Sequence, residues 1–206
     1  MKVNEYCFYD LYHKICYLER NEQTNQLFGS KMPFKLDNSA TGFVVYGYID
    51  HECGFTFEII GLAKKNIFGL KIIQIIENNS LKLRSGNNAN AEIKILNYED
   101  YPMFHNKINN INKIYYYGED IENTRKNRLI DKFRYNENPD DVQVLLFSKD
   151  LNPEVVWVRL KSEIDKNRFT GTLLNEPFNN YGIHKDNILT FELVKNQGDT
   201  ILISML

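Results

Sequence analysis

Most of the patterns by which a sequence reveals its chemistry are missing from this chain of 206 residues. It has no G-x-S-x-G elbow for a nucleophilic serine and no G-x-x-x-x-G-K-[ST] loop for phosphate. No apolar run reaches the roughly 18–20 residues that cross a bilayer. Residues 1–20 scatter charge among apolar side chains, unlike a signal peptide. We therefore expect a cytoplasmic protein with no membrane partner, no cofactor and no catalytic residue that the sequence alone identifies.

An excess of charge of one sign is also absent. Lys and Arg total 25 and Asp and Glu total 27, for a net charge of −2. Proteins that bind nucleic acid usually carry a marked basic excess, so we expect no nucleic-acid partner. Residues 116–206 hold 12 basic and 15 acidic side chains. That mild acidity would favour a basic protein partner.

Cysteine is scarce, and its spacing argues against metal and disulfides. Cys7, Cys16 and Cys53 are odd in number and form no pair such as Cys-x2-Cys. Zinc sites usually contain closely spaced ligand pairs, so His51 and Cys53 are interpreted as a loop histidine beside a partly buried thiol. We expect no metal site, and buried thiols in a reducing compartment.

Aromatic and β-branched residues are plentiful, with 13 Tyr and 13 Phe, and these favour strands. Thr41–Asp50 and Gly54–Ala63 flank a three-residue hairpin loop. Further strands are predicted in GLKIIQIIEN, LKLRS and AEIKIL, and in Ile114–Tyr117. The stretch CFYDLYHKICYLE is predicted to be a strand or a short amphipathic helix, and His105–Lys113 a polar connection.

One helix is predicted over Asp120–Phe133, because acids gather at its start and bases at its end, as the helix dipole favours. Asn138-Pro139 would end it. Its basic side chains are interpreted as a solvated face, the alternative being a patch for phosphate or an acidic partner. They are Arg125, Lys126, Arg128, Lys132 and Arg134.

Five short strands with tight turns follow the helix: VQVLLFS, VVWVRLKSEI, RFTGTLL, ILTFELV and ILISM. They predict a small curled sheet or open barrel. In the second strand, Trp157 is expected on the core face with Val155 and Arg159, opposite Val156, Val158 and Leu160, and the strand is expected to be central. The fold class is α+β, predominantly antiparallel β, in two small β-rich units, residues 1–117 and 118–206.

Residues 125–191 resemble an uncharacterised family of bacterial cytosolic β-rich domains. The matching pieces include PDDVQV at 139–144, PEVVWV at 153–158 and FTGTLLNEP at 169–177, followed by Gly182 and Asp186. Some relatives of that family are candidate immunity partners of polymorphic bacterial toxins. The resemblance implies a binding role and no reaction, so no catalytic residue carries over, and residues 1–115 lie outside it.

The loop Glu176–Lys185 is interpreted first as a structural return between two strands, with aromatic side chains that fold back onto the barrel. It is also a candidate contact surface, because aromatic side chains in polar loops are favoured interface anchors. Our hypothesis is a protein-binding module, in its narrower form an immunity protein that neutralises a basic toxin domain by stoichiometric association. The alternative is a small-molecule-binding or hydrolytic domain with a cleft between the two units, using Asp140, Asp141 and His184. If they have no such role, Asp140 and Asp141 are interpreted as closing a turn and pairing with Arg128 or Arg134. The candidate binding residues are Glu176, Phe178, Tyr181, His184, Asp186, Asp140 and Asp141.

Overall fold

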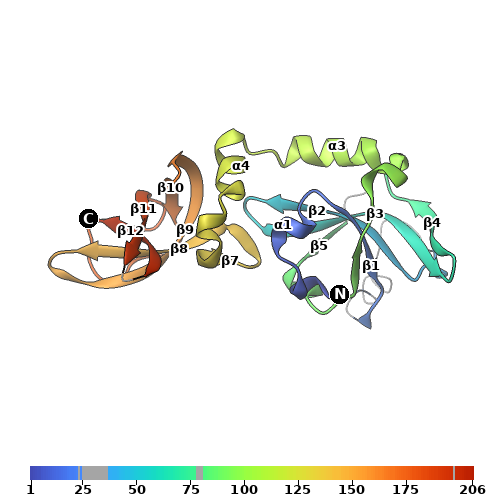
Figure 1. The fold of residues 1–206 in the computed structure, drawn as a ribbon, viewed down its shortest axis with the longest axis horizontal. Coiled ribbons are helices and arrows are strands. Elements are labelled where there is room, and N and C mark those ends of the chain that lie inside the picture. Colours follow the sequence, from blue (N-terminus) through green and yellow to red (C-terminus); the bar gives the residue numbers. More distant parts are fainter. Residues whose placement is uncertain (23, 25–36, 78–80, 197) are drawn as a thin grey trace. The chain divides into compact units, whose positions relative to one another are not determined.

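The chain divides into two compact units, Met1–Tyr116 and Tyr117–Leu206, in a computed structural model (Figure 1). The structure describes residues 1–22, 24, 37–77, 81–196 and 198–206. Each unit contains its own six-stranded sheet, and all strand pairings but one are antiparallel between named strands of the described residues. The fold is therefore α+β and predominantly antiparallel β, as predicted. The boundary expected from the sequence, after residue 117, differs from the observed one by a single residue.

The sheet of unit 1 has the order β4-β3-β2-β1-β6, and β5 pairs with β3. Strand β2 is buried along its whole length, because both of its faces are covered. Phe43 and Val45 point into one apolar cluster, and Tyr46 and Tyr48 point into another. The bounds are β1 (Ile15–Glu19), β2 (Gly42–Asp50), β3 (Gly54–Asn66), β4 (Gly69–Ile75), β5 (Lys82–Arg84) and β6 (Ile93–Ile95).

These strands match the predicted ones, including the hairpin between β2 and β3. The last residue of GLKIIQIIEN lies outside the described residues. The N-terminal stretch contains both of the structures considered for it, α1 (Phe8–Leu11) and then β1. Short 3-10 turns cover Val3–Glu5, Gly86–Asn88, Tyr98–Asp100 and Pro102–Phe104.

The segment predicted to be a connection and a strand is instead a helix, α3 (His105–Ile114). Phe104, Ile108 and Ile111 recur at helical spacing and are buried against the Tyr46 and Tyr48 face of the sheet. The many Asn residues between them have low helix propensity and concealed this period. Tertiary packing of this narrow apolar stripe therefore stabilises a helix in this segment. Residues 115–117, predicted to be in a strand, belong to no strand.

The thiols are not all buried, which corrects the expectation from the sequence. Cys16 on β1 is fully buried, whereas Cys7 and Cys53 are exposed. Burial raises the pKa of the Cys16 thiol to about 12, so this group stays protonated and shielded at neutral pH. The environment, not the number of cysteines, decides which thiols react.

We expect an aromatic disulfide reagent at neutral pH to modify two thiols in the native protein, and the third only after denaturation. A Cys16→Ala variant should leave the native count unchanged. A native count that falls in this variant would contradict the buried position of Cys16.

Unit 2 is a five-strand meander that closes on itself. The order is β12-β11-β10-β9-β8-β7, and β12 also pairs with β8 in parallel, with Ile203 opposite Leu145. The five predicted strands are present, β9 is central as expected, and the two-residue β7 was not predicted. The bounds are β7 (Arg134–Tyr135), β8 (Asn138–Ser148), β9 (Leu151–Asp165), β10 (Arg168–Leu173), β11 (Ile188–Asn196) and β12 (Asp199–Met205).

The single helix predicted over Asp120–Phe133 is divided in two. Helix α4 (Glu119–Lys126) ends, and a 3-10 segment, Arg128–Phe133, follows. Between them Asn127 is extended, and its side-chain oxygen accepts a hydrogen bond from the Leu129 amide at 3.0 Å. This local cap competes with continuation of the α-helix. Asn138-Pro139 does not end a helix but begins β8.

The predicted facing of Trp157 is inverted. Val156, Val158 and Leu160 are fully buried inside the ring, whereas Val155 is 56% exposed on the outside. Trp157 shares the outer side, half-buried, and its ring meets that of Tyr135 edge-on at 5.6 Å. A ring of so few strands has a narrow interior, which these aliphatic side chains fill together with Phe169 and Phe191. The alternation was therefore read correctly, but the indole was placed on the wrong face.

Candidate functional site

The loop between β10 and β11 is held in a fixed shape by two carboxylates. Glu154 accepts hydrogen bonds from the backbone amides of Phe178 at 2.7 Å and Asn179 at 3.1 Å. Glu176 accepts one from the Lys185 amide at 2.9 Å, and its other oxygen lies 2.6 Å from His184 Nδ1. These bonds join the two ends of the loop and attach its middle to β9. The loop is therefore a defined surface that needs little ordering when a partner binds.

Backbone geometry explains the glycine and aspartate of this region. Gly182 and Asp186 have φ angles of 74° and 71°, in the left-handed region. A Cβ at Gly171 would lie 2.5 Å from the Arg159 carbonyl oxygen and 2.5 Å from a Val158 methyl. Gly182 therefore permits a turn, and Gly171 permits the close approach of β10 to β9. Asp186 shapes the return to β11, since its amide donates to the Leu173 carbonyl at 2.8 Å.

The two aromatic residues proposed as anchors have different roles. The Tyr181 side chain is buried in the unit 2 core, and its hydroxyl donates to the Asn152 carbonyl. Phe178 is 94% exposed although its own amide is fixed to Glu154. Tyr181 therefore holds the loop, and Phe178 is the side chain that the loop presents to solvent.

The Glu176–His184 pair also belongs to the loop's internal structure. A hydrogen bond to His184 and another from the Lys185 amide lower the pKa of the Glu176 carboxyl from its ordinary value of 4.5. A lowered folded-state pKa stabilises the loop at pH values above the ordinary one, and this contribution is lost as pH falls through the lowered pKa. Both side chains are largely exposed, so solvent screening keeps the contribution small.

Asp140 and Asp141 do not lie in a turn, contrary to the expectation. Both are on β8, and both are buried. Asp140 receives two hydrogen bonds from Arg125, at 2.9 Å from Nε and 2.7 Å from Nη2. Asp141 is bound by Arg159 on the neighbouring β9 at 2.8 Å. These two partners, Arg125 and Arg159, differ from the arginines named from the sequence, Arg128 and Arg134.

The interpretation of the helical basic cluster as a solvated face is wrong for two of its members. Arg125 is 1% exposed and also binds Glu122 at 2.6 Å. Arg134 is 9% exposed and donates to the carbonyls of Pro139 and Thr124. These guanidinium groups attach α4 and the following segment to β8 by bidentate geometry that lysine lacks.

Among the candidate residues, Glu176 thus pairs with His184 in the loop, Asp140 of β8 pairs with Arg125 of α4, and Asp141 of β8 pairs with Arg159 of β9. The aspartates and His184, named for a hydrolytic alternative, are each engaged in structural bonds. Within the described ranges, no three His, Cys, Asp or Glu side chains gather in a way that suits a metal ion. His51 and Cys53 lie in the turn between β2 and β3.

An outward apolar face of unit 2, which the sequence analysis missed, crosses β9, β8 and β12. Register places Val155 opposite Leu145 and Leu145 opposite Ile203. Phe147 and Met205 form the next row, 37% and 64% exposed. The sequence signal was in VQVLLFS, where apolar residues occupy both alternating positions. We define the outer apolar face as Tyr135, Leu145, Phe147, Val155, Trp157, Ile203 and Met205.

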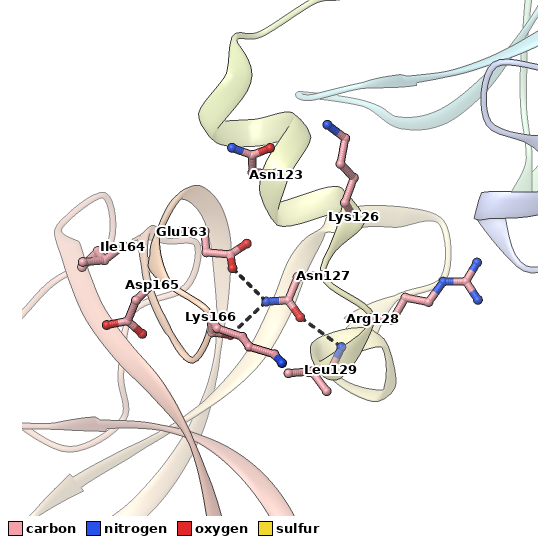
Figure 2. A pocket seen from close by; sticks show the side chains of 9 residues that line it. All are labelled: Asn123, Lys126, Asn127, Arg128, Leu129, Glu163, Ile164, Asp165 and Lys166. Carbon is pink, nitrogen blue, oxygen red and sulfur yellow. Dashed lines mark hydrogen bonds between the residues drawn. The ribbon is translucent and has the colours of Figure 1, made fainter.

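A pocket of about 580 Å³ opens between the segment around Asn127 and the β9–β10 hairpin (Figure 2). The Asn127 amide nitrogen donates to Glu163 Oε1 at 3.2 Å and to the Lys166 carbonyl at 3.0 Å. Small-molecule sites are mostly apolar, with a few converging polar groups, whereas this pocket mixes charges of both signs. Its lining residues are Asn123, Lys126, Asn127, Arg128, Leu129, Glu163, Ile164, Asp165 and Lys166.

Comparisons with protein-family models, with curated proteins and with solved structures found no match. The resemblance of residues 125–191 to a bacterial β-rich family therefore stays an expectation from the sequence. Among the described residues, no helix has both the length and the apolar character needed to span a membrane.

Proposed function

We propose that unit 2 is a protein-binding module that uses Phe178 as an anchor. The observation that carries this proposal is the combination of 94% exposure with a fixed backbone. A phenylalanine on a mobile loop can bury part of its ring against its own protein, but here the Glu154 carboxylate holds the Phe178 amide in place. A presented, pre-ordered aromatic side chain is typical of interface hot spots.

The outer apolar face supports the same proposal. Its rows join three neighbouring strands, so the exposed apolar side chains adjoin one another instead of being scattered. Contiguous apolar surface on a soluble domain often marks a contact site. Phe178 is attached through Glu154 to the strand that also carries Val155, so a partner that contacts β9 can reach both features.

The narrower form of the proposal is neutralisation of a bacterial toxin domain in the cytoplasm, as the resemblance implies. Residues 116–206 carry three more acidic than basic side chains, 15 against 12, which would steer a basic partner. Binding would be stoichiometric and would require no reaction. Growth rescue by co-expression with a toxin encoded beside the gene tests this narrower form.

Phe178→Ala should weaken the complex with a partner captured from native lysate by about 30-fold, corresponding to a hot-spot loss of about 2 kcal/mol. The thermal stability of the free protein should not change, because the ring packs against little of it. The dissociation constant is measured by titration calorimetry with the purified partner.

Ile164→Ala is the matched control, since Ile164 is a 51% exposed apolar residue of β9, the strand that carries Glu154, but lies at the β9–β10 hairpin. It should leave affinity unchanged. Equal losses for the two variants, or no loss for Phe178→Ala, would refute the assignment of Phe178 as the anchor.

A further inference from the structure

The β3–β4 hairpin of unit 1 projects beyond the sheet to which it belongs (Figure 1). Pairing of β3 with β2 ends at Ala63 opposite Gly42. Pairing of β3 with β4 continues through Lys64–Lys71, Lys65–Leu70 and Asn66–Gly69. Burial changes at the same point, because β3 is buried from Gly54 to Ala63 and exposed thereafter. The Lys65 amide still donates to Thr41 Oγ1 at 2.8 Å. At about 3.3 Å per residue, the ribbon beyond Lys65, which is Asn66 with the turn, extends about 7 Å.

Two bulky apolar residues form the tip of this ribbon. Ile67 and Phe68 are each 92% exposed. The turn is well defined, because the Phe68 amide donates to the Asn66 side-chain oxygen at 2.9 Å and Gly69 takes a φ of 130°. Hairpin turns usually carry Asn, Asp and Gly, which favour the turn and remain in water. Because Ile67 and Phe68 are almost fully exposed, their apolar surface can be buried only by contact with another molecule.

Lysines surround the tip on both strands. Lys64 lies directly opposite Lys71, a like-charge cross-strand pair that destabilises a hairpin by itself. Lys65 lies one residue closer to the tip and makes a loose ion pair with Glu19, at 3.7 Å with both side chains exposed. Asp37 is also close enough to Lys64 to feel its charge. Its pKa is lowered mainly by hydrogen bonds from Ser39 and, to a smaller extent, by the charge of Lys64.

We propose that the β3–β4 hairpin inserts Ile67 and Phe68 into the interface of an anionic lipid bilayer, with Lys64, Lys65 and Lys71 at the headgroups. The apolar tip would lie at the boundary of the acyl chains, and the lysines on the strands would lie at the level of the anionic headgroups. The projection of about 7 Å beyond Lys65 lies within the depth of about 5–10 Å that interfacial segments reach. This inference departs from the expectation of no membrane partner, which rested on spanning length and did not address surface insertion.

The test is flotation of the full chain with vesicles of phosphatidylcholine alone and of phosphatidylcholine mixed with phosphatidylglycerol. We expect binding to the anionic vesicles, and weakening as salt rises because the lysine contribution is screened. The double variant Ile67→Ser/Phe68→Ser should lower the partition coefficient at least about tenfold. Lys64→Gln/Lys71→Gln should lower it about fivefold for each lysine.

Phe178→Ser is the matched control, because it removes an equally exposed aromatic side chain from unit 2 and should leave vesicle binding unchanged. Insertion is measured separately with Phe68→Trp in a Trp157→Phe background. Brominated acyl chains should quench that tryptophan. Absence of wild-type binding to anionic vesicles, undiminished binding of the Ile67→Ser/Phe68→Ser variant, or an unquenched tryptophan would each overturn the proposal.

Discussion

Asp140→Leu is expected to lower the free energy of unfolding of unit 2 by about 3–5 kcal/mol. Removal of one partner of a buried ion pair leaves the other charge uncompensated in a low-dielectric interior. Asp140 is fully buried and Arg125 is 1% exposed, so water cannot solvate the remaining guanidinium without local opening. Glu122 still binds Nη1 of the same arginine, but Nε and Nη2 lose the buried carboxylate that accepts their hydrogen bonds. Chemical denaturation followed by the fluorescence of Trp157, the only tryptophan, measures the loss within unit 2.

The double variant Asp140→Leu/Arg125→Met separates an uncompensated charge from a general packing defect. It removes both charges and retains apolar volume, and replacements of this kind are often close to neutral. We expect its stability to lie well above that of Asp140→Leu and near the wild type. A double variant as unstable as the sum of the two single variants would mean that the charges are not coupled as the geometry indicates.

Gly171→Ala should destabilise unit 2 by about 3 kcal/mol, because the added methyl overpacks a closed site. The nearest atoms are the Arg159 carbonyl oxygen and a Val158 methyl, both at 2.5 Å. One is backbone of the central strand β9, and the other fills the core, so neither can move without disturbing the ring. For a unit of this size, the loss corresponds to a fall in melting temperature of more than about 10 °C.

Gly182→Ala is the useful comparison, since a Cβ there meets nothing within 4 Å and the only obstacle is a φ of 74°. Its expected cost is about 1 kcal/mol, the ordinary penalty for an L-residue in the left-handed region. Calorimetric melting of both variants should therefore rank Gly171→Ala as the more damaging. If Gly182→Ala lowered the melting temperature more than Gly171→Ala, the more restrictive glycine position would be in the loop and not in the ring.

Strands could be predicted from the sequence where apolar residues were continuous. The prediction failed where the sequence pattern allowed two structures and tertiary packing determined which one formed. Strands β2 and β3 follow directly from their apolar runs. Helix α3 could not be recognised, because three apolar residues among many asparagines become helical only through contact with Tyr46 and Tyr48. The facing of Trp157 depended on how wide the ring interior is, which is a property of strand number and not of the strand itself.

The same distinction applies to the candidate site. The loop of Glu176–Lys185 was found because polar turns with aromatic residues are recognisable locally. The separate roles of Phe178 and Tyr181 depend on a carbonyl at Asn152 and a carboxylate at Glu154, more than twenty residues earlier in the chain. Arg125 was assigned to a solvated face because its partner Asp140 is brought to it only when β8 pairs with its neighbours.

The parallel pairing of β12 with β8 sets the order in which the molecule is completed during its synthesis on the ribosome. Strand β8 is made early in unit 2, but the strand that seals its second edge is the last of the unit. Until Asp199–Met205 has left the exit tunnel, β8 and β11 each lack a neighbour, and unpaired strand edges promote association with other chains. Unit 1 precedes this stage and contains its whole sheet. Nascent chains should therefore gain protease resistance in two steps, and the second should come only after translation of unit 2 is complete and β12 has left the tunnel.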